Sequence, residues 1–88
     1  MRNEKAARVF LAMCEPARLQ ILQKLAKSKG CVQEIGKSVG RNQPNVSQHL
    51  RVLKDAGLVK TKREGKRVCY SLADERVKML IGIAEAIG

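Results

Sequence analysis

Hydrogen-bonding side chains recur at helical spacing along residues 42–57, which read N-Q-P-N-V-S-Q-H-L-R-V-L-K-D-A-G. With residues about 100° apart, Val46, Leu50 and Leu53 share one side of a predicted helix. The opposite side carries Pro44, Gln48, Arg51 and Asp55, with Asn45 and Ser47 at its edges. Amide side chains pair with adenine, and arginine pairs with guanine or with a phosphate. This surface therefore predicts contacts with the base edges of double-stranded DNA.

The N-terminal part of such a helix is the part that enters the major groove. The predicted DNA-contacting residues of the helix are Gln43, Asn45, Ser47, Gln48 and Arg51. Gln48 and Ser47 are the favoured base contacts, and for Arg51 a contact with a base and a contact with a phosphate are equally expected. The alternative is that these side chains only face solvent on the outer surface of the helix and contact no DNA. The single histidine, His49, is interpreted as a partly buried packing residue in preference to a DNA contact or a metal ligand.

A second group of charged residues follows at once, in the predicted hairpin tip. It consists of Lys62, Arg63, Lys66 and Arg67. Cations at such a position are expected to bind phosphates or an adjacent minor groove. The alternative is a solvated hairpin tip.

These residues need elements to position them, and residues 32–56 predict a helix-turn-helix. Val32, Ile35 and Val39 form the apolar stripe of a short helix. Gly40 suits the left-handed residue that ends it, and Asn42 suits the N-cap of the next helix. Residues 58–72 predict a wing of two strands, 58–63 and 67–72, around Glu64-Gly65-Lys66.

Helices are also predicted over 3–13, from Pro16 to about Lys27, and over 74–87. The last helix is apolar almost all round, so it has more apolar surface than the core of an 88-residue chain can cover. This excess favours a helix–helix dimer interface over a central core helix. The expected fold is mainly α (α+β). It is a winged helix-turn-helix of about five helices plus a two-stranded hairpin, in one domain spanning 1–88.

Composition points to a polyanionic partner. Lys and Arg total 18 against 8 Asp and Glu, giving a net charge of +10. Only Phe10 and Tyr70 are aromatic, which argues against single-strand binding.

No apolar run approaches the roughly 18 residues of a membrane span, and no signal peptide is visible, so a cytoplasmic protein is expected. The chain lacks the residue sets of an enzyme active site. A winged-helix protein-interaction module without DNA binding is the competing class.

Four segments carry a resemblance to the arsenical-resistance-repressor (ArsR/SmtB) family. They are L-A-M-C-E-P-A-R-L-Q-I-L at 11–22, C-V-Q-E-I-G at 31–36, N-V-S-Q-H-L-R-V-L-K-D-A-G-L-V at 45–59 and R-E-G-K-R-V-C-Y-S-L at 63–72. The resemblance implies a homodimeric repressor with its first and last helices (about 3–13 and 74–87) at the dimer interface. It also implies an effector that releases the protein from operator DNA.

The chain departs from both familiar sensor sites of that family. Gln33 stands where the family's C-V-C motif has its second cysteine, and the last helix has no histidine. No metal site and no cofactor are therefore expected. One hypothesis keeps Cys14 and Cys31 as an arsenite, soft-metal or thiol-redox site, within or across subunits. The other takes both as small buried apolar residues. Cys69 is expected on the outer face of the hairpin, away from any such site.

Overall fold

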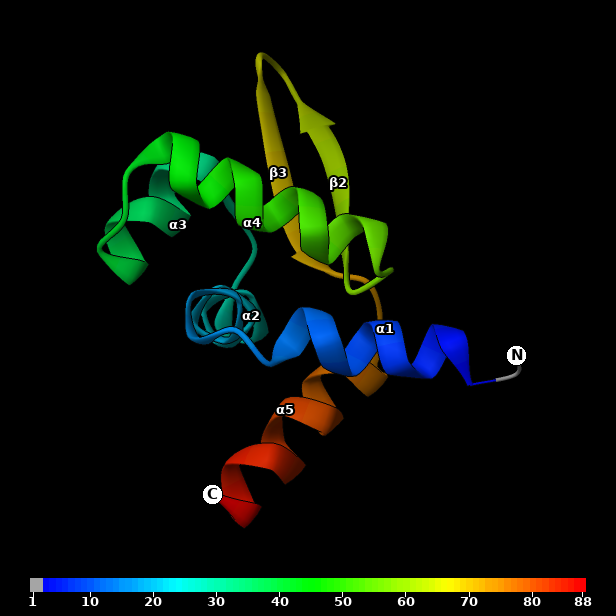
Figure 1. Cartoon of the computed structure of the whole chain (residues 1–88). Helices are drawn as coiled ribbons and strands as arrows, with labels where there is room; N and C mark the ends of the chain where they lie inside the picture. The colour runs from blue at the N-terminus through cyan, green and yellow to red at the C-terminus, as the bar shows by residue number, and fades with distance from the viewer. Residues whose placement is uncertain (1–2) are drawn as a thin grey trace.

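The computed structural model describes residues 3–88, which form five helices and three strands. Figure 1 shows how the helices and the two longer strands are arranged. Residues 1 and 2, which the predicted domain 1–88 includes, lie outside the described residues. In chain order the elements are α1 Glu4–Met13, α2 Pro16–Lys27, β1 Gly30–Cys31, α3 Val32–Val39, α4 Gln43–Asp55, β2 Val59–Glu64, β3 Arg67–Leu72 and α5 Glu75–Ile87. The predicted winged helix-turn-helix architecture is confirmed.

The turn between α3 and α4 has the geometry that the sequence predicts. Gly40 ends α3 in the left-handed region, with φ 70°. The side chain of Asn42 then accepts a hydrogen bond of 2.9 Å from the backbone N–H of Asn45, which caps α4. Pro44 lies in the first turn of α4, where a backbone N–H has no intrahelical partner. Only three residues separate the two helices, so their relative orientation is tightly defined.

The sheet differs from the prediction by one strand. β2 and β3 form the expected antiparallel hairpin, but β3 also pairs on its other edge with the two-residue β1, giving the order β1-β3-β2. Two residues are too short a run to show a period of two in the sequence. The wing is thereby attached directly to the residue that precedes α3.

The hydrophobic core lies where α2, α3 and α4 meet. Its fully buried side chains are Ile21, Leu22, Ile35, Val46, Leu50 and Leu53. The three that α4 contributes are those predicted for its packing side, so the opposite side of α4 must face solvent. This packing fixes which side chains of α4 are available to a partner.

Glu15 and Arg18 join α1 to α2. The carboxylate of Glu15 accepts hydrogen bonds from the N–H groups of Ala17 and Arg18, and it caps α2. The guanidinium of Arg18 reaches back to the C-terminal end of α1, where Nε donates to the carbonyl of Ala12 at 2.6 Å. The two residues thus satisfy backbone groups at two helix ends that would otherwise lack partners.

The wing and α5 extend from opposite ends of the molecule, with α4 beside the wing (Figure 1). α5 is capped by Asp74, whose side chain accepts a hydrogen bond from the N–H of Arg76. Within residues 3–88, no helix combines the length and the apolar character needed to cross a bilayer.

Candidate nucleic-acid interface

The solvent-facing side of α4 presents four of its five predicted contact residues. Gln43, Ser47, Gln48 and Arg51 are all exposed. The buried Val46 and Leu50 alternate with them and hold the opposite side of the helix against the core. The structure therefore places amide, hydroxyl and guanidinium groups together on one rigid helix. Their contact with DNA stays a prediction.

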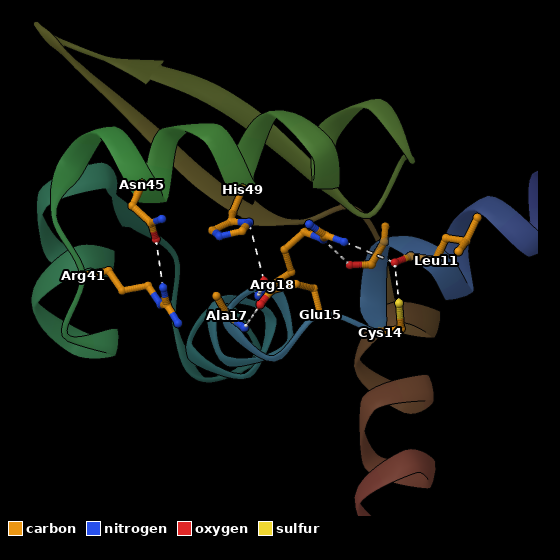
Figure 2. Close-up of polar contacts among 9 residues, drawn as sticks. Leu11, Cys14, Glu15, Ala17, Arg18, Arg41, Asn45 and His49 are labelled. Carbon is orange, nitrogen blue, oxygen red and sulfur yellow. Dashed lines mark hydrogen bonds and ion pairs between the residues drawn. The ribbon is translucent and has the colours of Figure 1, made fainter.

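Asn45, the fifth residue, is half-buried and points toward the α3–α4 turn (Figure 2). Its Oδ1 accepts a hydrogen bond of 3.3 Å from Nη1 of Arg41. Arg41 is exposed in the turn and was not among the sequence candidates. Its position between Gly40 and the N-cap Asn42 was the available signal, because a residue there lies at the N-terminus of the predicted recognition helix.

His49 lies one turn after Asn45 on the same side of α4 (Figure 2). Its side chain is only 17% exposed, and Nδ1 lies 3.6 Å from Oε2 of Glu15. The pKa of Glu15 is lowered, and the strongest cause is the hydrogen bond from the N–H of Ala17. The hydrogen bond from the N–H of Arg18 and the nearby His49 lower it further. This position agrees with the predicted packing role, and it links α4 to the N-terminal end of α2.

The four predicted wing cations fall into two groups. Lys62, Arg63 and Lys66 are exposed around the hairpin tip. Arg67 is also exposed, but its Nη2 donates to the sulfur of Cys31 at 2.7 Å and lies 3.3 Å from Oε1 of Glu34. The sulfur contact is the main cause of a raised pKa for Arg67. Arg67 is therefore held by the protein itself, whereas the other three cations project from the wing.

A further cation, Lys29, lies beside the wing. Its Nζ contacts Oε2 of Glu64 at 2.7 Å, and this hydrogen bond lowers the pKa of Glu64. Lys29 was not a sequence candidate, because no residue spacing connects it with the hairpin 35 positions later. The two charges of the pair cancel, so Lys29 adds no net positive charge at this edge of the wing.

Surface hollows connect α4 with the wing. Gln43, at the start of α4, lines a hollow of about 310 Å³ together with Lys66 and Arg67. Farther along the helix, Ser47 and Arg51 share a groove of about 420 Å³ with Tyr70 of β3. The start of α4 thus borders the wing cations Lys66 and Arg67, and the middle of α4 borders β3.

The cysteines occupy three different environments. Cys14 is exposed at the end of α1, where its thiol donates to the carbonyl of Leu11, so the interpretation of Cys14 as a buried core residue is wrong. Cys31 is buried, as that interpretation required. Cys69 is half-buried and lies directly opposite Cys31 in the β1–β3 pair, nearer to it than the sequence suggested.

Across residues 3–88, no three or more His, Cys, Asp or Glu side chains converge as a metal site would require. The expectation that the protein carries no cofactor stays a prediction.

Comparison with known proteins identifies close relatives of this chain. Residues 15–61 match the family described as "Bacterial regulatory protein, arsR family". An uncharacterized HTH-type transcriptional regulator of Methanocaldococcus jannaschii is 41% identical over 98% of both chains. The biofilm growth-associated repressor of Agrobacterium fabrum is 36% identical over 98% of this chain and 74% of the relative.

A solved structure shares the fold. It is the homodimeric winged helix-turn-helix DNA-binding domain of a Mycobacterium bovis protein, with a TM-score of 0.91 and 37% identity over 96% of this chain and 78% of that one. The likeness extends over the wing and the flanking helices as well as the helix-turn-helix.

Proposed function

The chain belongs to the arsR family of bacterial regulatory proteins, and we propose that it is a repressor that binds operator DNA as a homodimer. The observation that carries the proposal is the exposed polar side of α4 beside the cationic wing. Gln48 and Ser47 read bases in the major groove, while Lys62, Arg63 and Lys66 bind phosphates.

The dimer is proposed from the exposed apolar side chains of α1 and α5, and from the homodimeric relative of Mycobacterium bovis. Two recognition helices related by a twofold axis read two half-sites about 34 Å apart, or a multiple of that distance. A protein that binds chromosomal DNA works in the cytoplasm. This role requires no enzymatic activity, and the protein-interaction module is the class that must be distinguished from it.

Fluorescence anisotropy with the duplex upstream of the protein's own gene tests the proposal. Three projecting wing cations in each protomer give about six phosphate contacts per dimer, so affinity falls roughly 10³-fold between about 50 and 200 mM salt. A scrambled duplex of equal length binds far more weakly than the operator. Affinity that does not respond to salt, or equal affinity for both duplexes, contradicts the proposal and favours the protein-interaction module.

A further inference from the structure

Two cysteines face each other across the β1–β3 strand pair. Cys31 and Cys69 are direct partners in the antiparallel register. Side chains of directly opposed residues project from the same face of a sheet. The two sulfur atoms therefore belong to one small region, where the wing joins the start of α3.

The hydrogen bonding of Cys31 shows which kind of pair this is. Its backbone N–H donates to Oε1 of Glu34 at 2.9 Å, so it is not donated to Cys69. The pair is therefore of the non-hydrogen-bonded kind, in which the two α-carbons lie about 4.5 Å apart. Disulfide-bonded cysteines have α-carbon separations of roughly 4.4–6.8 Å. A strand pair of this kind therefore has the α-carbon spacing that a disulfide needs.

Each sulfur has a different charged partner in the reduced protein. The sulfur of Cys31 accepts from Nη2 of Arg67 at 2.7 Å. The thiol of Cys69 donates to Oε1 of Glu64 at 3.3 Å, which raises the pKa of Cys69. Rotation about the Cα–Cβ bonds would break both contacts and bring the two sulfur atoms together.

We propose that Cys31 and Cys69 form a cross-strand disulfide when the protein meets a small-molecule disulfide such as oxidised glutathione. The thiolate of Cys69, the more exposed of the two, attacks one sulfur of the oxidant and displaces one thiol. The thiolate of Cys31 then attacks the sulfur of Cys69 and displaces the second thiol. Two cysteine thiols become one disulfide, the oxidant is reduced to two thiols, and the two protons pass to them.

This bond changes the partners of Arg67, and this step rests on the proposed function. Once the sulfur of Cys31 is bonded to Cys69, Glu34 is the acceptor that remains for the Arg67 guanidinium. An exposed ion pair of this kind contributes little, so Arg67 becomes available to a DNA phosphate. Oxidation therefore adds about one phosphate contact per protomer, and the salt dependence of DNA binding steepens by about 2 log units per log unit of salt for a dimer.

The first measurement needs no DNA. Cys14→Ser removes the exposed thiol that could cross-link molecules, and the variant is incubated with oxidised glutathione. We expect its intact mass to fall by two hydrogen atoms and its tryptic peptides 30–37 and 68–76 to be linked. A protein that remains reduced, or that carries glutathione on either cysteine as its end product, overturns the proposal. Cys14→Ser/Cys69→Ser is the control and must show no internal link.

The second measurement compares reduced and oxidised Cys14→Ser on the operator duplex. We expect tighter binding and a steeper salt dependence after oxidation, and no such change in Cys14→Ser/Arg67→Ala. An oxidised protein with unchanged or weaker affinity overturns the Arg67 step and leaves the disulfide standing. Failure of the reduced protein to bind any duplex contradicts the proposed repressor function, while the disulfide is still judged by mass.

Discussion

Gln48 lies in the middle of the exposed side of α4. Val46 and Leu50, two residues before and after it in the sequence, are buried on the opposite side. Its amide can donate to and accept from one adenine at once, a pairing that rejects other bases. We expect Gln48→Ala to weaken operator binding by about 1–3 kcal/mol per half-site, which is roughly 30-fold or more for the dimer, and to change binding to a scrambled duplex little. Anisotropy titrations on both duplexes measure this, with the exposed Gln20→Ala on α2 as the control. An equal loss on both duplexes would show that Gln48 does not read sequence.

Lys66 represents the other kind of contact, because its ammonium at the hairpin tip can neutralise a phosphate of any sequence. We expect Lys66→Ala to weaken binding to operator and scrambled duplexes alike. The slope of log affinity against log salt should become shallower by about 2 for the dimer, one phosphate per protomer. Lys78→Ala, an exposed change on α5, is the control with an unchanged slope. A loss confined to the operator would contradict a phosphate contact.

Glu15 makes the stability of the fold depend on pH. Its pKa lies below the ordinary 4.5, first because its carboxylate accepts the N–H of Ala17. A carboxyl group with a lowered pKa in the folded state stabilises it fully above the ordinary value. That contribution is lost as the pH falls through the lowered value. We expect Glu15→Gln to lower the melting temperature at pH 7 and to differ less from the parent below about pH 4.

Thermal unfolding followed by circular dichroism across this pH range measures the effect of Glu15. The control is Glu75→Gln, an exposed carboxyl in the first turn of α5. A difference between Glu15→Gln and the parent that is the same at every pH would show that the charge of Glu15 contributes nothing.

Among the elements, the close approach of α3 to the turn depends on Gly36. A Cβ built there would lie 2.8 Å from the carbonyl oxygen of Arg41, a backbone atom that cannot rotate away. The same turn is closed by a 3.0 Å hydrogen bond from the N–H of Arg41 to the carbonyl of Gly36. We expect Gly36→Ala to destabilise the fold by about 1–3 kcal/mol, the usual effect of overpacking. Urea denaturation at fixed protein concentration measures it.

Ser38→Ala lies in the same helix and brings no new atom near the turn, so its stability should stay close to that of the parent. Equal stability of Gly36→Ala and the parent would show that α3 and the turn can separate without loss. Weaker operator binding by a Gly36→Ala protein that remains folded would show that the turn also sets the orientation of α4.

The helix-turn-helix was predictable from sequence because its signals are local. Gly40 and Asn42 each have a conformational preference that acts within a few residues, and the structure uses both as expected. The apolar stripe of α4 likewise fixed which side chains point outward. Expectations based on helix period and capping therefore held at the level of single residues.

The contacts around β1 could not be predicted, because they join residues far apart in the chain. The Arg67–Cys31 contact spans 36 positions, and Lys29 meets Glu64 across 35. A two-residue strand leaves no period in the sequence, so nothing indicated that Cys31 would lie opposite Cys69. The sequence alone therefore suggests Cys14 as the partner of Cys31, and only the strand register indicates Cys69.

At the scale of the whole molecule, charge and apolar surface are separated. The wing carries cations at one end, and the apolar side chains that remain exposed lie mainly on the flanking helices. Phe10 and Leu11 of α1 are 62% and 66% exposed, and Met79, Ile83 and Ile87 of α5 are 63%, 56% and 83% exposed. Neighbouring exposed apolar side chains on a small protein mark an interaction surface. A homodimer covers them and leaves both wings free for DNA.

Ile83→Lys tests this arrangement, because it places a charge in the proposed interface while changing no residue of α4 or the wing. We expect a monomer by sedimentation equilibrium, since an unpaired buried charge is strongly unfavourable. Operator affinity should fall by roughly 10²- to 10⁴-fold, because two half-sites held by one dimer reinforce each other. Lys78→Ala on the same helix should remain dimeric with parental affinity. A dimeric Ile83→Lys protein would contradict an interface through α5, whereas a monomer with full affinity would show that one protomer suffices for the operator.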